Sequence, residues 1–239
     1  MKSTLTLLAV CPILAFVLAG QAPPRPAAAL QTGGSRTDVY HVHFTKAALG
    51  KATALADSLK KPDPKAPMPG HFLVLRHQAG DSWDYVVIEH LGTQASLTAA
   101  GNPPAPGVRD LSEWHNDTFV NGPPWAQFVS QMGIGDAAAK TGEAVYVVSL
   151  YRAAPGFRDQ LESLLSGPSD EPSAGTVLLQ HLEGGPWNFL SIDRHNSWQD
   201  YAAGEAKSRP NLAKGQGDWF KIRDYLAFHT DTITDRIAP

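Results

Sequence analysis

The segment at positions 108–118, VRDLSEWHNDT, recurs at positions 222–232 as IRDYLAFHTDT. The likeness extends upstream, because residues 39–59 align with residues 145–165. A further matched pair of signals is Gly80-x-x-Trp83 and Gly184-x-x-Trp187. A repeat of this length decides the architecture before any single residue is interpreted. The sequence therefore predicts two copies of one folding unit.

Both copies show the same succession of periodicities. The stretch Tyr40-His41-Val42-His43-Phe44 alternates between apolar and polar residues, as a half-buried strand does. A helix with apolar residues on one face and then a hairpin of two strands are expected to follow. A second helical region is expected to begin near Thr93 or Ser197 and to end in the repeated Arg-Asp…His-x-Asp-Thr segment. Each copy thus reads as β-α-β-β-α, with a last short strand that the pattern does not place.

A βαββα(β) unit leaves one face of its sheet uncovered, and two fused copies can cover each other. This order of elements, with a Trp at the start of the third strand of each copy, resembles the dimeric α/β-barrel superfamily, which includes antibiotic-biosynthesis-type monooxygenases and chlorite dismutases. The resemblance implies an α+β fold of two tandem ferredoxin-like repeats packed as an intramolecular pseudo-dimeric barrel, either as a monomer or as a homodimer. It also implies a cavity between the sheets, or between a sheet and its helices. Such a cavity would hold a small, usually apolar or aromatic ligand, and sometimes haem.

The chain begins with Met1-Lys2 and an apolar run from Leu5 to Ala19, which is typical of a secretory signal peptide. We expect a signal peptide over 1–22, with cleavage between positions 19 and 29, and an exported protein of the periplasm or the extracellular space. The remaining organisation is expected as a disordered leader (23–36), a first repeat (37–129), a linker (130–142) and a second repeat (143–239).

Composition excludes several classes of function. Cys11, the one cysteine, lies in the expected signal peptide, so thiol chemistry and disulfides are excluded from the mature chain. The net charge of −3 comes without a basic run, which argues against nucleic acid or an anionic membrane as partner. A small molecule is the expected partner, and the protein is not expected to be membrane-bound after signal cleavage.

Residues shared by both copies are expected to serve the common architecture, so polar residues present in only one copy are the better candidates for a functional site. His41 and His43 project from one face of a strand, where the second copy has Val147 and Ser149. Because Tyr40, Val42 and Phe44 were expected to face the helices, the two histidines are expected to look into the barrel. They either hold a divalent metal, with a third ligand from His71, His77, Glu89 or His90, or they are polar residues facing a wet cleft.

The repeated histidines, His115 and His229, are expected on the apolar side of a helix, with Asp117 on the opposite side. They would be either cavity-lining bases or buried core residues. Tyr151 is a further candidate for the pocket, since it has no aromatic counterpart in the first copy. A haem alternative, implied by the resemblance, would use a histidine of the second copy: His181, His195 or His229.

No nucleophile elbow, phosphate loop or fixed metal motif is present, so no cofactor is required by the sequence. Two hypotheses remain. The first is an exported module that binds a small apolar or aromatic molecule. The second is an enzyme using the same cavity, either oxygenase-like or a histidine-metal or haem oxidoreductase.

Overall fold

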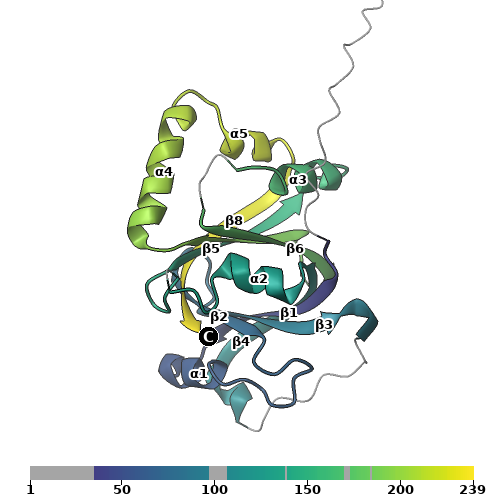
Figure 1. Cartoon of the computed structure of the whole chain (residues 1–239), viewed down its shortest axis with the longest axis vertical. Helices are drawn as coiled ribbons and strands as arrows, with labels where there is room; N and C mark the ends of the chain where they lie inside the picture. The colour runs from purple at the N-terminus through teal and green to yellow at the C-terminus, as the bar shows by residue number, and fades with distance from the viewer. Residues whose placement is uncertain (1–34, 97–106, 138, 170–172, 184) are drawn as a thin grey trace, which may run out of the picture. The chain divides into compact units, whose positions relative to one another are not determined.

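A computed structural model describes residues 35–96, 107–137, 139–169, 173–183 and 185–239. In these residues eight strands close into one antiparallel barrel, in the order β1-β3-β2-β8-β5-β7-β6-β4 (Figure 1). The expected signal peptide lies outside the described residues. The strands are β1 (Asp38–Ala47), β2 (Phe72–Ala79), β3 (Tyr85–Thr93), β4 (Ser112–Gly122), β5 (Val145–Ala153), β6 (Gly175–Glu183), β7 (Phe189–His195) and β8 (Leu226–Ala238).

Helices α1, α3, α4 and α5 lie outside the strands, whereas α2 packs against the barrel core (Figure 1). In Figure 1, α1 and α3 flank opposite sides of the barrel, while α4 and α5 lie on the side of α3. The helices are α1 (Ala52–Leu59), α2 (Trp125–Met132), α3 (Arg158–Leu165), α4 (Trp198–Leu212) and α5 (Asp218–Arg223), with 3-10 turns at η1 (Gln94–Ser96) and η2 (Val108–Leu111). None of the helices described is both long and apolar enough to cross a membrane.

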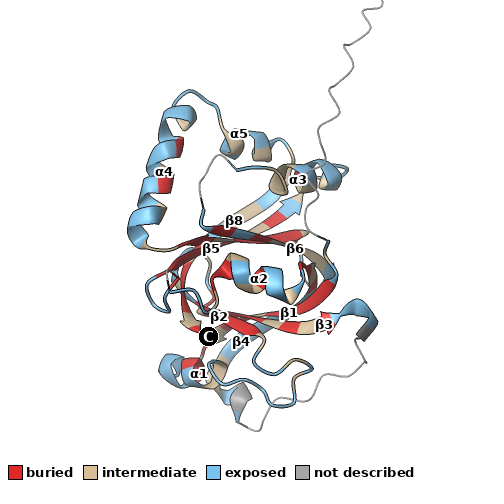
Figure 2. Ribbon diagram, in the orientation of Figure 1, coloured by how far each residue is buried: buried red, intermediate tan, exposed pale blue. Residues whose placement is uncertain are grey.

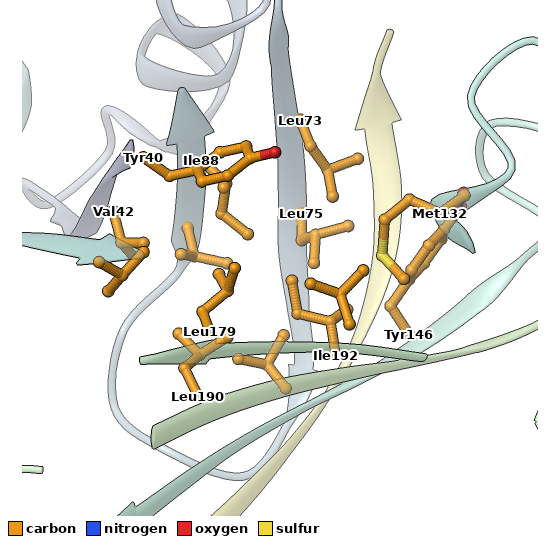
Figure 3. Packing of buried hydrophobic residues seen from close by; sticks show 14 of the residues in the cluster. Tyr40, Val42, Leu73, Leu75, Ile88, Met132, Tyr146, Leu179, Leu190 and Ile192 are labelled. Carbon is orange, nitrogen blue, oxygen red and sulfur yellow. Dashed lines mark hydrogen bonds between the residues drawn. The ribbon is translucent and has the colours of Figure 1, made fainter. Parts of the chain in front are cut away.

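The barrel is filled by side chains. Val42 and Ile88 from one part of the chain pack in a single buried cluster with Leu179 and Ile192 from the other (Figure 3). Helix α2 adds Phe128 and Met132 to the same cluster. Eight strands leave an interior just wide enough for side chains, which explains why buried residues line the inner wall of the sheet (Figure 2).

Strand pairing is equivalent in the two halves, which we define as β1–β4 and β5–β8. Val42 of β1 pairs with Ile88 of β3 and with Thr118 of β4. Val148 of β5 pairs in the same way, with Ile192 of β7 and Thr232 of β8. The halves join where β2 meets β8 and where β4 meets β6, so neither half keeps a free edge.

The repeated segment is where the sequence prediction was wrong. The expected helix around His115 is instead the turn η2 followed by strand β4, and the segment around His229 is strand β8. Strands β4 and β8 are the last strands of the two copies, whose positions the sequence pattern did not predict. Apolar residues spaced three or four positions apart are typical of a helix. In this segment, however, Thr118 and Val120 are buried on alternate positions, as in a strand. Barrel closure decides the outcome, because β4 and β8 cover edges that would otherwise be unpaired.

Other predicted elements are confirmed. Both hairpins form, and α3 follows β5 as the apolar spacing predicted. Helix α4 begins at the predicted capping residue, since the Ser197 hydroxyl accepts a hydrogen bond of 3.1 Å from the Asp200 amide. The stretch 130–142, expected to be a linker, includes the end of α2 and the buried residues Met132 and Ala139.

Candidate functional site

The outer face of β1 carries the two histidines that the sequence singled out. Tyr40, Val42 and Phe44 point into the barrel core, so His41 and His43 project outward, toward the side where α1 lies. The expectation that these histidines face the barrel interior was therefore wrong. In a closed eight-stranded barrel the inner face is the better buried one, and the larger apolar side chains occupy it.

Antiparallel register brings two carboxylates to these histidines. His43 pairs with Asp117 of β4, and His41 pairs with Glu89 of β3. Asp117 Oδ1 lies 3.0 Å from His41 Nε2 and 2.7 Å from His43 Nδ1. Glu89 Oε2 lies 3.0 Å from His41 Nδ1. The result is a continuous chain of side chains, Glu89–His41–Asp117–His43, which we call the His–Asp cluster.

In the His–Asp cluster, the carboxylates stabilise the protonated form of His41, and the histidines stabilise the ionised form of Asp117. Burial acts to lower the pKa of His41, but the hydrogen bonds to Asp117 and Glu89 together outweigh it and raise the pKa to about 9. Hydrogen bonds from His41 and His43 hold the pKa of the Asp117 carboxyl well below its usual range. In the absence of another cation, His41 is therefore an imidazolium between two carboxylates at neutral pH.

His115 joins the edge of this cluster. Its ring stacks on that of His43, with centroids 5.4 Å apart, and its Nε2 lies 3.5 Å from Asp117 Oδ2. The side chain is 51% exposed. The prediction that His115 is a buried helical residue was wrong, because it stands on the outer face of a strand near the solvent.

A small cavity of about 140 Å³ opens beside the cluster. Its floor is the outer face of the sheet and its wall is the end of α1 with the segment that follows. Six of its eight lining residues are polar or charged, although most of the surface that they expose to the cavity is apolar. The lining consists of His41, His43, Ser58, Leu59, Lys61, Asp63, Val87 and Glu89.

Of the predicted third ligands, Glu89 alone reaches His41. His90 lies on the neighbouring position of β3, where its Nε2 is 2.8 Å from Asp38 Oδ2, and it stacks with His71. His77 contacts the ring of Trp83. Asp117, the carboxylate at the centre of the cluster, was missed because its segment was expected to be helical. The available signal was the i, i+2 spacing of His115 and Asp117, which places both on one face of a strand.

The equivalent face of the second half holds a different set of side chains. Tyr151 is buried and stacks on His229, with ring centroids 4.8 Å apart. His229 Nε2 lies 2.9 Å from Asp231 Oδ1, and the Ser149 hydroxyl donates to the same oxygen at 2.6 Å. His229, expected on a helix, is thus a half-buried strand residue. Tyr151 and His229 meet each other but belong to the opposite half of the barrel from His41 and His43.

The histidines of the haem alternative have separate surroundings. His181 on β6 accepts a hydrogen bond from the Gly185 amide and contacts Trp187. His195 at the end of β7 is buried against Tyr201. The ring partners come from other parts of the fold, since Trp187 precedes β7 and Tyr201 lies on α4.

Comparisons with known proteins define the fold. No family model matches the chain, and no curated protein matches it. The crystal structure of an anthrone oxidase-like protein is similar, with a TM-score of 0.54 and 14% identity over 85% of this chain and 92% of that one. A candidate monooxygenase from Lactobacillus acidophilus shows a TM-score of 0.48 and 9% identity, over 84% of this chain and 94% of that one. The first likeness shows the fold, an α+β barrel.

Proposed function

We propose that this protein is an exported module that binds a small molecule in the cavity beside the His–Asp cluster. The observation that carries the proposal is the cavity itself, floored by His41, His43 and Glu89 and bounded by the residues that follow α1. A concave site with a few convergent polar groups and perturbed pKa values is the usual form of a ligand site.

The size and lining of the cavity limit the ligand. A volume of about 140 Å³ is close to the engineered cavities of about 150 Å³ that hold one benzene ring. Leu59 and Val87 supply an apolar wall, whereas Lys61, Glu89 and the two histidines present charge and hydrogen-bonding groups. A single ring with a polar edge therefore fits the cavity, which narrows the apolar or aromatic class expected from the sequence.

The proposal includes the organisation of the chain. Equivalent pairing of β1 with β3 and β4, and of β5 with β7 and β8, supports a tandem of two ferredoxin-like repeats in which the second replaces the partner of a dimer. On this reading the mature chain is a monomer. Export rests on the apolar run from Leu5 to Ala19. N-terminal sequencing of protein from the culture medium or periplasm tests cleavage between positions 19 and 29.

Catechol and benzoate test the binding function, since each combines one ring with a polar edge of donors or acceptors. We expect saturable amide shifts in β1, β3 and residues 58–63 when either is added to ¹⁵N-labelled protein in EDTA. His43→Ala should weaken binding by about tenfold, a loss of one hydrogen bond to a charged group. His229→Ala, its matched control in the second half, should leave binding unchanged. Absence of a saturable response to both probes up to ~10 mM would overturn the proposal.

The fold favours a second candidate, an oxygenase-like enzyme, because the similar crystal structure is that of an anthrone oxidase-like protein. In this chain His43, oriented by Asp117, would accept the proton that an activated aromatic substrate loses, with dioxygen as the oxidant. Oxygen uptake with anthrone above that of a His43→Ala variant would favour the enzyme over the binding module.

A further inference from the structure

Two contacts in the His–Asp cluster bring possible metal ligands together. His41 Nε2 and Asp117 Oδ1 are 3.0 Å apart, and His43 Nδ1 and the same oxygen are 2.7 Å apart. A neutral imidazole whose ring nitrogen presents a lone pair repels a carboxylate oxygen at such distances. Either a proton occupies each contact or a metal ion lies between the three atoms.

The same distances suit a metal. Ligand atoms that each lie about 2.1 Å from an ion are about 3.0 Å apart at right angles and about 3.4 Å apart in a tetrahedral arrangement, so small side-chain shifts would admit an ion. The three ligand atoms of His41, His43 and Asp117 all lie within 4.8 Å of each other. Two imidazoles and one carboxylate on neighbouring strands form the arrangement that binds first-row divalent metals and leaves other coordination positions open.

The surroundings complete a metal site. Glu89 Oε2, 3.0 Å from His41 Nδ1, accepts the hydrogen of that nitrogen, which leaves the Nε2 lone pair available to an ion that Asp117 also binds. The charges of Asp117 and Glu89 balance a divalent ion. The side chains of His41 and His43 are 22% and 25% exposed, which allows an ion to enter and water to complete its coordination.

We propose that His41 Nε2, His43 Nδ1 and an Asp117 oxygen bind a divalent transition-metal ion, with Glu89 orienting His41. This inference deepens the proposed function and rests on it for its purpose, since the ion would offer open coordination positions to a ligand in the adjoining cavity. Binding of the ion replaces the protons of the His–Asp contacts and releases them to the solvent. The second half has Val147 and Ser149 at the positions of His41 and His43, so it lacks the two imidazoles.

Calorimetric titration of the chelator-treated protein with Zn²⁺ tests the site. We expect one ion per chain with a dissociation constant in the micromolar range or below. Asp117→Asn and His43→Ala should each weaken binding more than tenfold, and Glu89→Gln should weaken it by about 10- to 100-fold without changing the stoichiometry. His229→Ala, which removes the histidine paired with Asp231 in the second half, is the matched control and should bind like wild type.

Co²⁺ supplies a readout that does not depend on the stability of any variant. Its visible absorption in the wild-type protein should report nitrogen and oxygen ligands and should disappear when Zn²⁺ is added. No heat from Zn²⁺ and no Co²⁺ band in the wild type would overturn the metal site, as would equal affinity in Asp117→Asn. Because the catechol and benzoate titrations are made in EDTA, failure of the metal site leaves their outcome unaffected.

Discussion

Asp38 at the start of β1 is expected to contribute strongly to the free energy of unfolding, because one side chain satisfies two hydrogen-bond donors. Its side chain is buried, and its Oδ2 accepts hydrogen bonds from the Trp125 backbone amide at 3.0 Å and from His90 Nε2 at 2.8 Å. Trp125 is the first residue of α2, and Pro124 before it provides no side-chain cap. Asp38 therefore caps α2 from another element and places a negative charge at the N-terminal end of that helix.

The cost of Asp38→Ala follows from these two contacts. Loss of a helix cap costs about 1–2 kcal/mol, and a buried imidazole N–H left without an acceptor costs about 1–3 kcal/mol. We expect a decrease of about 2–5 kcal/mol in the free energy of unfolding. Asp38→Asn keeps an acceptor oxygen for the Trp125 amide and should lose only about 1 kcal/mol, mainly the charge at the helix terminus.

Urea denaturation at pH 7, followed by circular dichroism, measures both values. Asp159→Ala is the control, since its carboxylate is 94% exposed and the change should be within about 0.5 kcal/mol. A stability of Asp38→Ala indistinguishable from that of the control would refute the reasoning, because it would mean that neither α2 nor His90 depends on the carboxylate.

Two further perturbations address the packing. Burial lowers the pKa of His90 despite the nearby Asp38, so the folded state binds fewer protons than the unfolded state; stability should be complete above pH ~6.5 and fall below it. Denaturation of His90→Gln between pH 5 and 7 should show a smaller slope, whereas an unchanged slope would count against His90. Gly175→Ala would place a Cβ 2.0 Å from the Gln131 carbonyl oxygen, and the required shift of α2 or β6 should lower the melting temperature by several degrees. A variant that melts with wild type would show that α2 does not pack as closely as described.

The sequence predicted the hairpins, α1, α3 and the start of α4 because their signals are local. Alternation at Tyr40–Phe44 marks a strand, and the hydroxyl of Ser197 marks a helix start whatever the rest of the chain does. The candidate site was predicted in part: His41, His43 and Glu89 do meet. Asp117 was absent from that prediction, because its role depends on a strand whose periodicity was read as helical.

The sequence by itself predicted an α+β fold from its repeated segments, and it determined that His41 and His43 share one face of a strand. The tertiary structure decided which face that is. Alternation divides the side chains of a strand into two faces, but it does not show which face points into a closed barrel. In this barrel the face that carries Val42 points inward. The tertiary structure also decided the partners of the histidines, since register between β1 and β4 depends on closure by residues distant in sequence. Long-range pairing therefore assembles the His–Asp cluster, and no local pattern encodes that pairing.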